Sequence, residues 1–159
     1  MEIDGAESVN VWPYVGYYIL TVTVATIAFA VFLVFVPSMA ESLGKASGFA
    51  INLASTMFAS SKFIRHNGRL FNREEYWKIV SFSTLAACLF SAIQGFLVLE
   101  GGARPELSSL PPSALVGIML FAGLLTFVLN ILGYSSRFGK SFLKAELERR
   151  ARTDAATFR

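Results

Sequence analysis

The stretch Lys62–Lys78, KFIRHNGRLFNREEYWK, is a polar segment between two long apolar runs in a chain of 159 residues. Its basic side chains are Lys62, Arg65, Arg69, Arg73 and Lys78. Short loops that are rich in lysine and arginine stay on the cytoplasmic side when a protein is threaded through a membrane. The stretch therefore predicts a basic cytoplasmic loop, residues 62–78, and this loop sets the orientation of the rest of the chain.

The loop also carries local signals for a turn and for a helix start. Gly68 can adopt the positive φ that other residues resist. Asn72 followed three residues later by Glu75 is the pattern of a capping box, which predicts a helix that begins at Arg73. The loop can be a hairpin that only sets topology, or a site for an anion, a lipid headgroup or a protein partner. The candidate interaction residues are Arg65, Gly68, Arg69, Arg73, Glu75 and Trp77.

Residues 63–77 resemble a known motif. The pattern Phe63-x-Arg65-x-x-Gly68-Arg69, then Asn72-Arg73-x-Glu75-x-Trp77, is similar to the central motif of a family of small four-span bacterial inner-membrane proteins. Members of that family tend to have proline at the position of Phe71 and threonine at that of Asn72, although asparagine can also cap a helix. The resemblance implies a four-span topology and brings no known activity with it.

Composition limits the class of protein. Hydrophobic residues make up 54% of the chain and are gathered into runs, which indicates an integral membrane protein. The single cysteine, Cys88, and the single histidine, His66, exclude an internal disulfide and a cysteine- or histidine-rich metal site. The net charge of +3 comes from the loop and the tail, so nucleic acid is not an expected partner. We predict no cofactor and no metal.

The predicted fold is all-α, an integral membrane four-helix transmembrane bundle that forms a single membrane domain over residues 1–159. Each apolar run can supply the ~20 residues that cross a bilayer. The predicted spans are residues 13–36, 43–64, 76–99 and 113–135. Trp12, Tyr14, Tyr17 and Tyr18 are expected to anchor the first span at the membrane–water interface.

Charge predicts the orientation. Five basic residues lie in the loop and seven in the tail, residues 136–159, whereas the expected outer side has only Lys45 and Arg104. We therefore expect a multi-pass protein of the cell inner membrane with both termini in the cytoplasm. The connector 100–112 should lie outside, and a short helix of the tail should lie on an anionic leaflet.

Small and uncharged polar residues follow single faces of the predicted helices. Small side chains at every third or fourth position let helix backbones approach closely within lipid. Because a short loop joins the second and third spans, we expect them to run antiparallel side by side, with Asn52 and Gln94 near enough to share hydrogen bonds. The candidate intramembrane packing residues are Gly48, Asn52, Ser91, Gln94, Gly95 and Asn130.

No catalytic signature stands out, such as a nucleophile–base pair, a metalloprotease motif or a phosphate loop. The membrane cores of the predicted spans contain no Asp, Glu, Lys or Arg, the residues on which ion-coupled carriers depend. We therefore expect a non-enzymatic protein that acts through helix–helix contacts with a partner, either as an accessory subunit or as an immunity protein against a membrane toxin. A small channel or neutral-solute transporter is the alternative. The expected partners are the bilayer, with anionic lipid at the loop and tail, and another membrane protein or a second copy.

Overall fold

The computed structural model describes residues 8–100 and 110–157, and within these ranges the regular structure is all helical, with no strand. This confirms the all-α class. The helices are α1 (Trp12–Phe35), the short 3-10 helix η1 (Pro37–Met39), α2 (Ala40–Asn67), α3 (Arg73–Glu100), α5 (Pro112–Gly133) and α6 (Ser136–Thr157). Most of the expected connector 100–112 lies outside the described residues.

Three helical stretches are long and apolar enough to cross a membrane, namely α1, Arg73–Leu97 of α3, and Pro112–Thr153, which combines α5 with part of α6. They match the first, third and fourth predicted spans. The second predicted span, residues 43–64, lies in α2, and α2 does not reach the same apolarity. Large apolar side chains on α1 and α5 are exposed, including Phe35 (79%) and Leu120 (70%), as expected for helices that face lipid.

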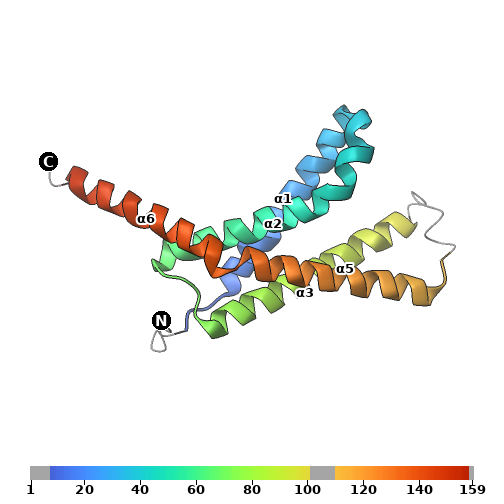
Figure 1. Ribbon diagram of the computed structural model, residues 1–159. Helices are drawn as coiled ribbons and strands as arrows, with labels where there is room; N and C mark the ends of the chain where they lie inside the picture. Colours follow the sequence, from blue (N-terminus) through green and yellow to red (C-terminus); the bar gives the residue numbers. More distant parts are fainter. Residues whose placement is uncertain (1–7, 101–109, 158–159) are drawn as a thin grey trace.

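The helices form two pairs that meet at one end and diverge toward the other (Figure 1). One pair is α1 with α2, joined by η1, and the other is α3 with α5. The connection between α2 and α3, the described start of the chain and the end of α6 all lie toward the closed end of this V-shaped arrangement (Figure 1).

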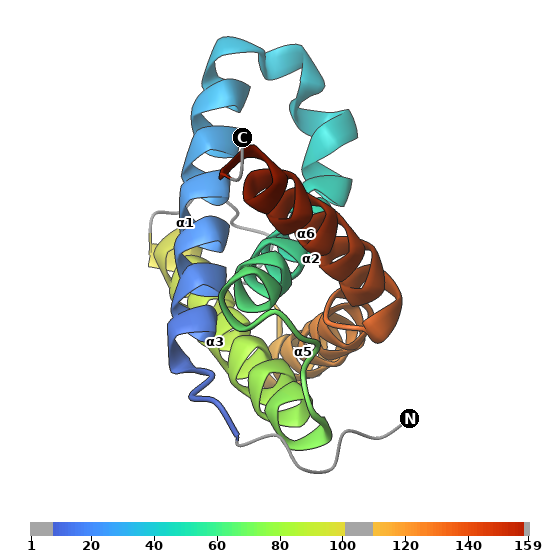
Figure 2. The ribbon, with the colours of Figure 1, turned by 90° about the vertical axis from the view of Figure 1, so that its left-hand side faces the viewer.

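The expected side-by-side packing of the second and third spans is wrong. α2 packs against α1, α5 and α6, whereas α3 packs against α1 and α5 (Figure 2). The five residues from Gly68 to Asn72 are not helical, and an extended chain of that length reaches roughly 17 Å. A short connection can therefore carry the chain past a neighbouring helix, so loop length alone did not determine which helices are in contact.

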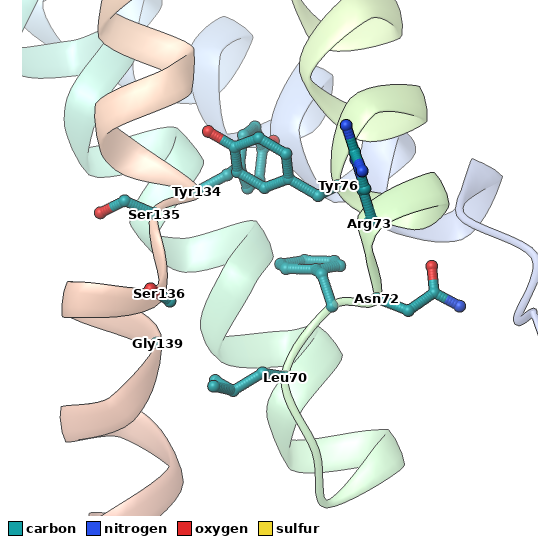
Figure 3. A pocket seen from close by; sticks show the side chains of 9 residues that line it. Leu70, Asn72, Arg73, Tyr76, Tyr134, Ser135, Ser136 and Gly139 are labelled. Carbon is teal, nitrogen blue, oxygen red and sulfur yellow. The ribbon is translucent and has the colours of Figure 1, made fainter. Parts of the chain in front are cut away.

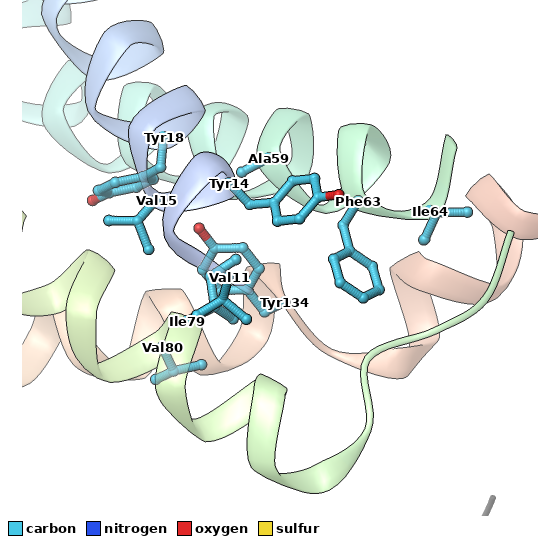
Figure 4. Close-up of a cluster of buried hydrophobic side chains, with 10 residues drawn as sticks. All are labelled: Val11, Tyr14, Val15, Tyr18, Ala59, Phe63, Ile64, Ile79, Val80 and Tyr134. Atoms are coloured by element: carbon cyan, nitrogen blue, oxygen red, sulfur yellow. The ribbon is translucent and has the colours of Figure 1, made fainter. Parts of the chain in front are cut away.

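The position of α2 explains its modest apolarity. Asn52, Ser55, Thr56 and Ser60 all lie on α2 and are at most 9% exposed. A helix that is covered by its neighbours does not need an apolar surface, and small polar side chains allow those neighbours to approach closely. Next to this polar face, a cluster of buried apolar side chains from α1, α2, α3 and the α5–α6 junction fills the closed end (Figure 4).

Helices α5 and α2 approach each other closely at Gly133, the last residue of α5. A Cβ atom added there would clash with Thr56 Oγ1 and would lie 2.7 Å from Thr56 Cβ, so α5 touches α2 at this point.

We expect Gly133→Ala to destabilise the protein by about 1 to 3 kcal/mol through overpacking. Thermal unfolding in detergent measures the effect. Gly117→Ala is the matched control on the same helix, because nothing lies within 4 Å of its Cβ position. Equal melting temperatures for the two variants would contradict the close contact.

Candidate functional site

Most of the predicted basic loop, residues 62–78, is helical, because α2 extends to Asn67 and α3 begins at Arg73. Only residues 68–72 are non-helical, and we keep the name basic loop for residues 62–78. Gly68 has φ +66°, the only positive φ among the described residues, and its N–H donates to Ile64 O at 2.7 Å. A left-handed glycine directly after the last helical turn is a common way to end a helix. The expected turn at Gly68 is thus confirmed, and it directs the chain from α2 into the loop.

The predicted capping box is also present, and α3 begins at Arg73 as expected. The Glu75 N–H donates to Asn72 Oδ1 at 2.8 Å, and the Asn72 N–H donates to Glu75 Oε2 at 3.0 Å. These reciprocal bonds satisfy backbone donors that the first helical turn leaves without partners. They also hold the Glu75 side chain back toward the loop.

Glu75 then forms the central ion pair of the loop. Arg69 Nη1 donates to Glu75 Oε2 at 2.8 Å and Arg69 Nη2 donates to Oε1 at 2.7 Å, a bidentate arrangement. The N–H of Val9, in the N-terminal segment before α1, donates to the same Oε1 at 2.7 Å. Glu75 is 1% exposed, so its charge is buried but fully surrounded by donors.

The electrostatics follow from these donors. Burial by itself would raise the pKa of the Glu75 carboxyl, but the hydrogen bonds from Arg69, Asn72 and Val9 hold that pKa below its ordinary value. The same hydrogen bond to Glu75 raises the pKa of Arg69. Glu75 is therefore a carboxylate and Arg69 a guanidinium at neutral pH. Neither group has a pKa near neutral pH, as a general acid or base would.

Aromatic rings and the tail helix fix the loop further. Phe63 and Phe71 stack with ring centroids 4.0 Å apart, and the Arg69 guanidinium lies 5.5 Å from the centroid of Phe63. Arg150 of α6 donates from Nη2 to the Arg65 carbonyl at 2.7 Å. The tail is indeed helical, and α6 packs on the end of α2.

The predicted interaction residues separate into two groups. Gly68, Arg69 and Glu75 stabilise the loop, and Arg69 is occupied by Glu75. Arg65, Arg73 and Trp77 are exposed, and no side-chain hydrogen bond or ion pair joins Arg65 or Arg73 to any described residue. The three arginines therefore do not form one cluster. The Arg69–Glu75 pair was not expected from the sequence, because Arg69 was explained as a topological charge and Glu75 as part of a helix cap.

A pocket of about 330 Å³ lies between the loop and the junction of α5 and α6 (Figure 3). Its lining includes Leu70, Phe71 and Tyr134, with Arg73 as the only charged residue among the described ones. Arg73 and Ser135 lie on opposite sides of this pocket in Figure 3, so its polar groups do not converge on one point. The arrangement offers no ready anion site.

Polar contacts also join the helices above the loop. Tyr18 OH donates to Asn52 Oδ1 at 2.9 Å, which joins α1 to α2. Asn130 Nδ2 donates to Thr84 Oγ1 at 2.9 Å, which joins α5 to α3. The expected hydrogen bond between Asn52 and Gln94 is absent from the described contacts. Tyr14 and Tyr18 are 5% and 1% exposed, so their predicted place in an interfacial aromatic anchor is wrong. The Tyr18 hydroxyl on an otherwise apolar helix was the sequence signal for this contact, because a buried tyrosine hydroxyl usually needs a hydrogen-bond partner.

The remaining packing candidates line two hollows between the helices. Ser91 and Gly95 line a groove of about 360 Å³ between α3 and α5. Gly48, Asn52, Ser91 and Gln94 line a cleft of about 510 Å³ between the two helix pairs. Nothing lies within 4 Å of a Cβ atom added at Gly48 or Gly95, so neither glycine packs closely within the chain.

Neither hollow has the composition of a metal centre. Within residues 8–100 and 110–157, no three His, Cys, Asp or Glu side chains are placed to share a metal ion. The arrangement offers a fixed basic loop and two uncharged hollows between helices.

We expect Glu75→Gln to destabilise the protein by about 1 to 3 kcal/mol, because it leaves the Arg69 charge and two backbone donors with weaker partners. Glu74→Gln is the matched control. Glu74 is 62% exposed and forms a surface ion pair with Lys78, for which about 0.3 to 0.5 kcal/mol is expected. Chemical unfolding in detergent at pH 7 measures both, and equal effects would contradict the structural role of Glu75.

The same pair of variants should differ in pH dependence. Because the folded pKa of Glu75 is lowered, its stabilising effect is complete above the unfolded value of about 4.3 and is lost as pH falls through the folded pKa. The stability of the wild type and of Glu74→Gln should therefore fall more steeply below about pH 4.3 than that of Glu75→Gln.

No protein family, no curated protein and no solved structure matches the chain. The resemblance of residues 63–77 to a four-span family therefore remains a prediction. The structural features that bear on function are the loop, the groove and the cleft.

Proposed function

We propose that this protein is a multi-pass protein of the cell inner membrane that works, without catalysis, by docking a transmembrane helix of a partner protein. The observation that carries the proposal is the groove between α3 and α5, which is lined by small residues and has open space at the Cβ position of Gly95 within the described part of the chain. An accessory subunit of a membrane complex and an immunity protein against a membrane toxin both fit this description.

The proposed topology has four crossings, with α2 as the second. α1 and α3 are each apolar enough to cross, and both run from the closed end of the V toward the open end. The chain must therefore return along α2, whose polar residues are covered by α1, α5 and α6. The loop and α6 carry most of the basic residues and lie toward the closed end, so we assign that end and both termini to the cytoplasm.

The groove suits a helix because of the size of its residues. Ser91, Ala92 and Gly95 line it from α3, and Ala122 and Gly123 line it from α5. Within lipid, helices associate by close packing at small residues, because lipid tails are as apolar as leucine. An additional helix could thus pack against both α3 and α5. The exposed Arg65, Arg73 and basic tail are proposed to hold anionic lipid, at about 1 kcal/mol for each charge near the surface.

A small channel or carrier for a neutral solute is the second candidate. The cleft of about 510 Å³ favours it, since its volume lies within the range of about 300 to 1,000 Å³ typical of ligand sites. The cleft adjoins the groove and shares Ser91 and Ala122 with it, whereas Gly95 lines the groove and not the cleft.

The test of the helix-docking proposal is a comparison of Gly95→Leu with Gly117→Leu. Both glycines have open space at the Cβ position, so both variants should fold, but only Gly95 lines the groove. A partner that co-purifies with the wild type in mild detergent should be recovered at least about tenfold less with Gly95→Leu, equivalent to 1.4 kcal/mol. Its recovery with Gly117→Leu should be unchanged.

Quantitative mass spectrometry of the purified complexes reads the result. Equal recovery of the partner with Gly95→Leu and with the wild type would contradict docking in the groove. Solute uptake by vesicles that contain the purified protein alone would favour the carrier instead.

A further inference from the structure

The cleft between the two helix pairs contains an amide group with an unused donor. Asn52 is 9% exposed and lines the cleft on α2. Its Oδ1 accepts the hydrogen bond from Tyr18, which also lines the cleft, on α1. No described residue accepts a hydrogen bond from Asn52 Nδ2. A ligand that supplies an acceptor for this N–H gains one hydrogen bond, worth about 0.5 to 1.5 kcal/mol net.

The rest of the cleft is uncharged. Among its described lining residues there is no Asp, Glu, Lys, Arg or His. Val22, Phe90 and Leu125 supply apolar walls from three helices, and Gln94 supplies a second carboxamide from α3. A charged molecule would lose its hydration in the cleft without gaining a counter-ion. A neutral molecule with one polar end avoids this large desolvation cost.

We propose that the cleft binds an uncharged, membrane-soluble molecule of drug-like size that carries a carbonyl oxygen, and that Asn52 Nδ2 donates a hydrogen bond to this oxygen. The apolar body of the molecule lies between the α1–α2 pair and the α3–α5 pair. The volume of about 510 Å³ suits such a molecule. The proposal is independent of helix docking, because Gly48 and Asn52 line the cleft and not the groove, whereas Gly95 lines the groove and not the cleft.

Prodan, an uncharged naphthalene ketone whose fluorescence shifts to the red when the ketone accepts a hydrogen bond, is the probe that tests this site. It is titrated into lipid nanodiscs that contain the protein, and the signal of empty nanodiscs is subtracted. The wild type should bind it saturably and with a red shift. Gly48→Leu should weaken binding at least tenfold because its side chain enters open space in the cleft. Gly117→Leu, which lines neither hollow, should stay within twofold of the wild type.

Asn52→Ala should weaken prodan about fivefold, the loss of one neutral hydrogen bond, and should abolish the red shift. Dimethylaminonaphthalene, which lacks the ketone, should bind the wild type and Asn52→Ala equally. Gly95→Leu should bind prodan like the wild type, so failure of the groove proposal and failure of the cleft proposal give different results. Absence of saturable binding to the wild type, or equal binding by Gly48→Leu and Gly117→Leu, would overturn the proposal.

Discussion

The Glu75 carboxylate accepts hydrogen bonds from Arg69, from the Asn72 N–H and from the Val9 N–H, and these contacts tie the loop, the start of α3 and the N-terminal segment together. A buried carboxylate is tolerated only when donors surround it, and here they come from separate parts of the chain. Because Glu75 is the third residue of α3, the direction of that helix depends on the same contacts. The hydrogen bond from Val9 thus holds the N-terminal segment before α1 at the start of α3.

The helices are packed differently at the closed end, near the loop, and at the open end. Near the loop, aromatic rings, buried hydroxyls and the contact of Gly133 with Thr56 hold the pairs together. Farther away the two pairs separate, and Gly48 and Gly95 have no neighbour within 4 Å of a Cβ position. One end is therefore well packed, and the other retains the space in which a partner helix or a small molecule can bind.

Much of the architecture could be predicted from local sequence. The apolar runs gave the helix bounds within a few residues, and the Asn72–Glu75 spacing correctly placed the start of α3 at Arg73. These features depend on residues close together in the chain. The order of the helices in space could not be predicted, because five non-helical residues after α2 can reach more than one neighbouring position.

The candidate site was predicted only in part, for a similar reason. Arg69, Glu75 and Asn52 were singled out in the sequence, but the contacts that they make in the structure were not. Tyr18 is 34 residues from Asn52, and Val9 is 66 residues from Glu75. Such pairs depend on which helices touch. The polar residues of α2 lower its apolarity in the sequence. In the structure they are buried, because neighbouring helices cover α2.

The amide of Val9 offers the most direct test of the central role of Glu75. Val9 lies in no helix, and its N–H has the Glu75 carboxylate as its acceptor. A hydrogen bond to a charged group is worth about 1.5 to 3 kcal/mol, so hydrogen exchange at Val9 should be at least about tenfold slower than in an unstructured peptide. This protection should fall several-fold in Glu75→Gln, whose uncharged amide oxygen is a weaker acceptor, and persist in Glu74→Gln. Exchange of the Val9 amide at the unstructured rate in the wild type would contradict the account.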